Sequence, residues 1–141
     1  MKNYCNFDEK QLADRGTAFR YGFIAALAMM VSAYFATDIL EIQIERSLLF
    51  YICFWIPEII CAVTLIVKDA YDGINSHRGR TLMAFFGILG LILIVLPAVR
   101  VLSGKYRFAE EFSHLFVGFC VMIQSLVYWV KQYSNQKKFA D

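Results

Sequence analysis

The sequence predicts an all-α integral membrane protein in which four helices form one bundle. Hydrophobic residues make up 59% of the 141 positions, and only 18% of the residues are charged. The apolar residues are concentrated in four long runs, each close to the roughly 20 residues that cross a bilayer as a helix. The runs cover residues 18–37, 47–67, 81–99 and 112–130.

Short connectors set the expected order of these helices. The links between the runs are nine, thirteen and twelve residues long. Links of this length place consecutive helices beside each other in opposite directions, so an up-down-up-down bundle is expected. We therefore divide the chain into an N-terminal tail over 1–17, a transmembrane bundle over 18–130 and a C-terminal tail over 131–141.

The placement of Lys and Arg predicts that both termini are cytoplasmic. Ten of the fourteen basic residues lie in or beside the two tails and the connector 68–80, and four lie on the other side of the membrane. Cytoplasmic segments of membrane proteins carry this excess of positive charge. Each segment has too few basic residues to indicate binding of nucleic acid.

The N-terminal tail is polar and contains a helix start. Asp8 and Gln11 have the spacing of a capping box, so a helix is predicted to begin near Asp8 and can continue into the first run. We consider Asp8, Glu9, Gln11 and Arg15 candidates for docking a cytoplasmic partner, and a solvated surface helix is the alternative. The first run could also be a secretory signal, but its long lead-in and the lack of a small-x-small cleavage site favour a membrane span.

Two of the runs contain small residues at helical spacing. In the first run they share one face of the helix and would let another backbone approach closely, which drives helix association in lipid. This small-residue face consists of Ala25, Ala28, Ser32 and Ala36. In the third run, Gly87 and Gly90 offer the same kind of close approach.

Glu58 is the most informative residue, because it stands near the middle of the second run, directly after Pro57. An ionised acid at that depth costs on the order of 3 kcal/mol, so it should be protonated, paired or exposed to a wet cavity. Pro57 lacks an amide proton and is expected to kink the helix and free the carbonyl of Cys53. Two interpretations remain open: a packing kink with one interhelical hydrogen bond, or a transport or gating site.

The fourth run supplies a polar partner for that glutamate. Cys120, Gln124 and Tyr128 follow at intervals of four and share a helix face. The second and fourth helices are expected to run in the same direction, which places Gln124 at a depth similar to that of Glu58. We therefore expect a hydrogen bond across the bundle, with Glu58, Pro57, Gln124 and Tyr128 as the intramembrane candidates.

The sequence shows no motif typical of an enzyme, a metal centre or a cofactor site. It has no nucleophile with a base, no H-E-x-x-H and no paired membrane aspartates. Asp69 and Asp72 could share a cation, but the further ligands of a dedicated site are missing, and His77 has no second histidine at ligand spacing. The cysteines form no C-x-x-C pair and are interpreted as packing residues: Cys5, Cys53, Cys61 and Cys120.

The first twenty or so residues carry a recognisable set of positions: Asp8, Glu9, Gln11, Arg15, Gly16, Phe19, Tyr21 and Gly22. In these residues the opening of the chain resembles a group of small, uncharacterised four-helix membrane proteins of Gram-positive bacteria. It implies a bacterial plasma-membrane protein, and genes of that group often neighbour helix-turn-helix regulators. No catalytic residues are established for the group, so none are transferred to this chain.

These observations favour a non-catalytic accessory, regulatory or partner-binding module of the membrane. The expected partners are the lipid bilayer and either a second copy of the chain or another membrane protein. A small transporter or channel that uses Glu58 for proton or cation coupling is the alternative.

Overall fold

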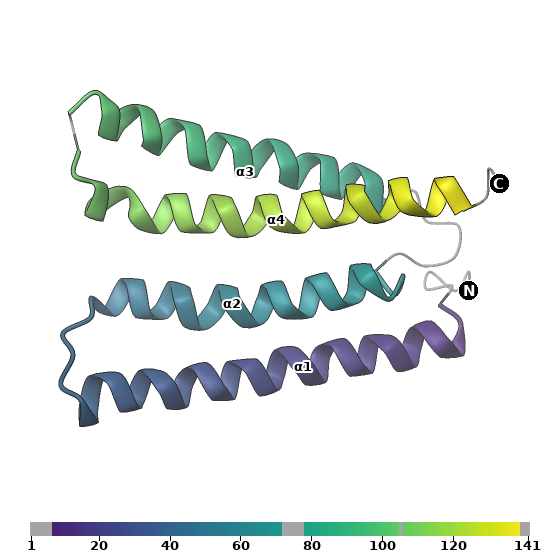
Figure 1. Ribbon diagram of the computed structural model, residues 1–141, viewed down its shortest axis with the longest axis horizontal. Helices are drawn as coiled ribbons and strands as arrows, with labels where there is room; N and C mark the ends of the chain where they lie inside the picture. Colours follow the sequence, from purple (N-terminus) through teal and green to yellow (C-terminus); the bar gives the residue numbers. More distant parts are fainter. Residues whose placement is uncertain (1–6, 72–77, 105, 139–141) are drawn as a thin grey trace, which may run out of the picture.

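The computed structural model describes residues 7–71, 78–104 and 106–138 and is all-α over these residues (Figure 1). The predicted fold class of four long helices is confirmed. The elements are α1 (Glu9–Tyr34), the π-helical segment η1 (Phe35–Ile39), α2 (Arg46–Val67), α3 (Arg78–Leu102) and α4 (Phe108–Lys138). All four helices are long and apolar enough to cross a membrane.

The first and last helices extend beyond the predicted membrane runs. The Asp8 carboxylate accepts a hydrogen bond from the amide of Gln11 at 2.6 Å, and the Gln11 side chain accepts one from the amide of Asp8 at 3.3 Å. This capping box starts α1, which then continues without a break into the first run. At the other end of the chain, α4 continues to Lys138, so neither expected tail boundary interrupts a helix.

The helices stand in a row instead of closing into a ring (Figure 1). α1 packs on α2, α2 packs on α4, and α4 packs on α3, whereas no other pair of these four helices packs together in the described parts of the chain. The molecule therefore consists of two hairpins, α1–α2 and α3–α4, joined along α2 and α4. We call this junction the α2–α4 seam.

Glycines allow the two helices of each hairpin to pack closely. A Cβ atom at Gly90 would lie 3.0 Å from the carbonyl oxygen of Gly118, and one at Gly87 would lie 2.8 Å from the Ser125 hydroxyl. Between α1 and α2, a Cβ atom at Gly22 would lie 2.9 Å from the Cβ of Cys61. Gly87 and Gly90 thus lie at a helix contact, as their spacing suggested, and van der Waals packing of this kind holds helices together in lipid.

The predicted small-residue face of α1 does not coincide with its contact on α2. Ala18 and Gly22 are buried against the neighbouring helix, whereas Ala28 and Ser32 are exposed. Ala25 and Ala36, the other two members of the face, are half-buried at its edge. Ala28 and Ser32 therefore take no part in the contact between α1 and α2, because α1 is rotated so that Ala18 and Gly22 meet α2. Close approach at these two residues stays a prediction for a partner helix.

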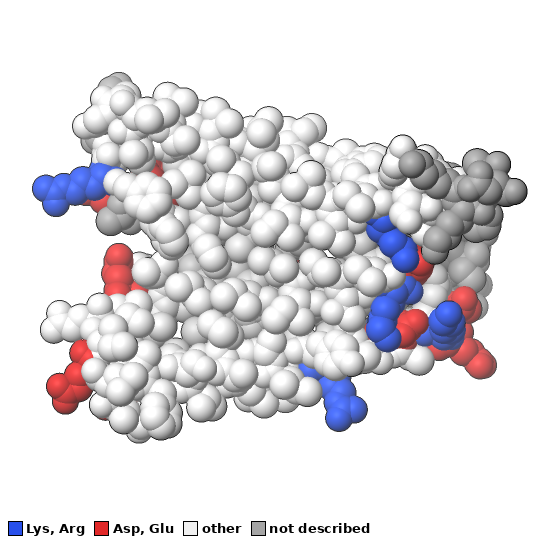
Figure 2. All heavy atoms as spheres, in the orientation of Figure 1, with Lys and Arg blue, Asp and Glu red and all other residues white. Residues whose placement is uncertain are grey.

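The two ends of the molecule differ in charge. The start of α1 and the end of α4 lie together at the right in Figure 1, and we call this the tail end; the opposite end is the loop end. More Lys and Arg side chains are visible at the tail end than at the loop end, and the face between them is almost free of charge (Figure 2). Such a band is the surface expected of a chain surrounded by lipid.

Candidate functional site

A hydrogen bond between Glu58 and Gln124 joins the two hairpins in the middle of the α2–α4 seam. The side-chain amide of Gln124 donates to Oε2 of Glu58. Gln124 is only 3% exposed and Glu58 is half-buried. The hydrogen bond expected from the matching depths of these residues is therefore present, and the carboxyl group has a protein partner inside the apolar band.

Pro57 lies on the side of α2 that faces α1. It is buried, and its carbonyl oxygen would lie 3.3 Å from a Cβ atom at Gly22. One turn earlier, the thiol of Cys53 donates to the carbonyl oxygen of Met29 at 3.8 Å. α2 continues through Pro57 as a single helix. The proline side of the helix is thus covered by α1, while Glu58 points into the seam with α4.

Tyr128 lies one turn from Gln124, toward the tail end. It is 3% exposed and packs in a buried cluster with Ile66 and Met83. The ring of Tyr71 meets it edge to face, with centroids 6.2 Å apart. Beside this cluster, the Ser125 hydroxyl donates to the carbonyl oxygen of Met83 at 2.8 Å. Tyr128 therefore occupies a packed core between the two hairpins.

α1 holds the turn after α2 by polar contacts that were not predicted from the sequence. The side chains of Gln11 and Arg15 donate to the carbonyl oxygens of Asp69 and Ala70, at 3.0 and 3.1 Å. Both carbonyls belong to the turn that follows the C-cap of α2, so these bonds fasten that turn to α1. Of the four candidates for docking a partner, two thus serve the fold through these bonds and Asp8 serves it as the helix cap, whereas Glu9 is exposed.

α4 holds the same turn of α2 from the other side. Lys131 pairs with the carboxylate of Asp69 at 3.1 Å and also donates to the carbonyl oxygen of Val67 at 2.9 Å. Asn135 donates to Asp69 at 3.2 Å. Asp69 is therefore occupied by side chains of α4, while Asp72, His77 and Cys5 lie outside the described residues. Within those residues, no group of three or more His, Cys, Asp or Glu side chains could hold a metal ion.

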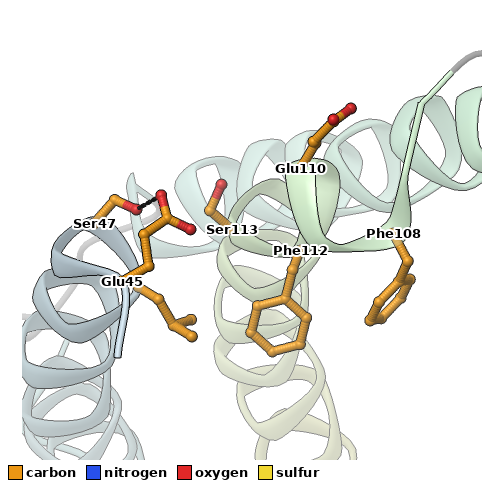
Figure 3. Close-up of a pocket in the computed structure, with 7 residues that line it drawn as sticks. Glu45, Ser47, Phe108, Glu110, Phe112 and Ser113 are labelled. Carbon is orange, nitrogen blue, oxygen red and sulfur yellow. Dashed lines mark hydrogen bonds between the residues drawn. The ribbon is translucent and has the colours of Figure 1, made fainter. Parts of the chain in front are cut away.

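At the loop end the seam opens into a cleft of about 430 Å³. Figure 2 shows this end of the molecule hollowed between the two hairpins. The cleft combines carboxylates, hydroxyls and apolar side chains from α2 and α4 and from the residue before α2: Glu45, Ser47, Leu48, Phe108, Glu110, Phe112 and Ser113. In Figure 3 the Glu45 carboxylate lies between Ser47, to which it is hydrogen-bonded, and Ser113 of α4, whereas the side chain of Glu110 points away from the rings of Phe108 and Phe112.

The cleft lies on the same helix faces as the Glu58–Gln124 pair. Ser47 precedes Glu58 by eleven residues, and Ser113 precedes Gln124 by eleven residues. Eleven residues are close to three helical turns, or about 16 Å along the axis. The cleft was not predicted from the sequence, although this repeated spacing of polar residues in two apolar runs was a signal for it.

Comparison with protein-family models, with curated proteins and with solved structures finds no match to this chain.

Proposed function

We propose that the chain is a non-catalytic accessory or partner-binding module of the bacterial plasma membrane. In this proposal it crosses the membrane four times in up-down-up-down order, with both termini cytoplasmic. The four apolar helices support the membrane location. Two observations support the orientation. The start of α1 and the end of α4 lie at the same end of the molecule, and ten of the fourteen basic residues are expected on the cytoplasmic side.

The hydrogen bond from Gln124 to Glu58 is the observation that carries this proposal. A carboxyl group that couples transport must exchange its partner for water, a proton or a cation. Glu58 instead accepts a hydrogen bond from a buried amide of the other hairpin. It also lines neither the loop-end cleft nor the smaller cleft beside Tyr128 and Lys131. These contacts favour a structural role, in which Glu58 fastens the hairpins together.

The row of helices leaves surfaces on which a partner helix can pack. Among the described residues, α1 has only α2 as a neighbouring long helix, and α3 has only α4. On α1, the exposed Ala28 and Ser32 are small enough for another backbone to come close. A second copy of the chain or another membrane protein is the partner that such a surface fits.

Substitutions at Ser32 test the partner surface. We expect Ser32→Leu to dissociate the complex of the chain with its partner, because the added volume separates the two backbones. Ser32→Ala should leave the complex intact. The control is Val31→Leu, which changes a large side chain that is already 62% exposed. Native mass spectrometry of the protein in detergent or nanodiscs would give the composition, and an unchanged complex in the Ser32→Leu variant would place Ser32 on lipid.

A small transporter or channel is the second candidate, and the continuity of the seam favours it. The loop-end cleft and Glu58 lie on the same faces of α2 and α4, about three helical turns apart. The decisive measurement is pH-dependent flux of protons, cations or drugs into proteoliposomes, with wild-type protein and Glu58→Gln. We expect no flux from either protein. Flux that is present in the wild type and disappears in a folded Glu58→Gln variant would show that the chain is a transporter and not a partner-binding module.

Cysteine labelling tests the proposed orientation. The native cysteines are replaced by alanine, and single cysteines are introduced at Gln43 in the connector before α2 and at Gln136 near the end of α4, both exposed. A membrane-impermeant maleimide should label position 43 in intact cells and position 136 only after the cells are opened. Labelling of position 136 in intact cells would refute the cytoplasmic C-terminus.

A further inference from the structure

The loop-end cleft has the dimensions and the mixed lining of a small-molecule site. Its volume of about 430 Å³ falls within the range that proteins use for small ligands. Its walls come from both hairpins, since Ser47 and Leu48 belong to α2 and Phe112 and Ser113 belong to α4. A ligand in this position would contact both halves of the molecule.

Two carboxylates give the cleft a negative charge. Glu45 accepts a hydrogen bond from the Ser47 hydroxyl at 2.5 Å, and Glu110 accepts one from the backbone amide of Arg107 at 3.2 Å. Neither carboxylate forms an ion pair with a basic side chain in the part of the chain that the structure describes. Their hydrogen-bond partners are neutral groups, although both carboxylates stand at helix N-termini, whose dipoles offset part of their charge.

Aromatic rings line the cleft beside this charge. The rings of Phe108 and Phe112 meet edge to face with centroids 5.7 Å apart, and the ring of Phe116 stacks on Phe112 at 6.2 Å. The faces of such rings attract cations, and their area binds apolar groups. The same carboxylates repel an anion of equal size, so the cleft should attract cations and exclude anions.

From this combination we propose that the loop-end cleft binds a hydrophobic organic cation, an amine or an onium ion that carries apolar groups. The cation lies beside the Glu45 carboxylate and the Ser113 hydroxyl, and the apolar groups lie against Leu48 and Phe112. Glu110 at the rim adds attraction at longer range. This binding site goes beyond the proposed partner-binding role and does not depend on it, because the partner surface is on α1 and the cleft is on α2 and α4.

Binding of tetraphenylphosphonium to the full chain in nanodiscs tests the proposal. Isothermal titration calorimetry should show saturable binding to wild-type protein. We expect Glu45→Gln combined with Glu110→Gln to weaken binding about tenfold, since two favourable charge interactions are lost. Tetraphenylborate, which has nearly the same shape and the opposite charge, should show no saturable binding.

A matched control separates the cleft from the general charge of the loop end. Glu41 is exposed at the same end of the molecule but does not line the cleft, so Glu41→Gln should leave binding unchanged. Phe112→Leu should weaken binding without changing the charge. The proposal fails if the phosphonium ion does not bind saturably, if the double variant binds as tightly as wild type, or if the borate binds equally well.

Discussion

The tail end and the loop end of the α2–α4 seam are built differently. At the tail end, Tyr128 is buried against Ile66 and Met83, and Lys131 and Asn135 hold Asp69 at the end of α2. At the loop end the same two helices enclose a cleft of about 430 Å³. The Glu58–Gln124 hydrogen bond lies between these two regions.

This difference indicates how the two hairpins are held together. The packed tail end fixes their relative position, and the bond at Glu58 limits how far they separate toward the loop end. Beyond that bond, Glu45 and Glu110 place like charges on the two sides of the opening. We therefore expect substitutions at the tail end to destabilise the fold, and substitutions at the cleft to change mainly what binds there.

The largest expected effect compares one aromatic residue from each end. Tyr128→Ala should lower the free energy of unfolding by about 3 kcal/mol, since it empties a packed core. Phe112→Ala, at a half-buried side chain that lines the cleft, should cost about 1 kcal/mol or less. Unfolding by sodium dodecyl sulfate in mixed micelles would measure both values. Equal losses of unfolding free energy in the two variants would mean that both ends contribute equally to the stability of the fold.

A smaller effect is expected at the bond between the two ends. Glu58→Leu leaves the buried amide of Gln124 without its partner and should cost about 1–2 kcal/mol. Glu58→Gln retains an acceptor of the same size and should cost under about 0.5 kcal/mol. The same unfolding experiment reports both variants, and a glutamine variant as unstable as the leucine variant would show that the fold requires the carboxyl group itself.

The smallest effect concerns the charged groups at the surface. Lys131→Met removes the ion pair with Asp69 and the hydrogen bond to the carbonyl of Val67, and it should cost about 0.5 kcal/mol, because these groups are partly exposed. The loss should shrink as salt is added. Glu45→Gln at the loop end should leave stability unchanged within about 0.3 kcal/mol, since it breaks no ion pair in the described residues. A loss at Glu45 as large as that at Lys131 would remove the contrast between the ends.

Residue spacing along the chain and depth in the membrane were enough to predict several features of the structure. Hydropathy predicted the four helices, the spacing of Asp8 and Gln11 predicted the capping box, and the matched depths of Glu58 and Gln124 predicted their hydrogen bond. Each of these depends on distances along a helix or across the membrane, which follow directly from position in the chain.

Other features depend on which way each helix faces, and the sequence does not determine this. Side chains that face lipid and side chains that face another helix are equally apolar. Hydropathy therefore could not show whether the four helices stand in a row or close into a ring. For the same reason, the sequence did not determine whether Ala28 and Ser32 face α2 or point away from it. The contacts of Gln11 and Arg15 join residues more than fifty positions apart, which local spacing cannot reveal.

Distances between spin labels at the two ends would test most directly whether the Glu58–Gln124 bond holds the hairpins together. Double electron–electron resonance would be recorded in nanodiscs, with native cysteines replaced by alanine. One label pair is placed at Arg46 and Arg107 at the loop end, and another at Val67 and Ser134 at the tail end, all exposed positions. We predict that Glu58→Leu lengthens and broadens the loop-end distances while the tail-end distances stay narrow, and that Glu58→Gln matches wild type at both ends. Unchanged loop-end distances in the leucine variant would contradict this role of Glu58.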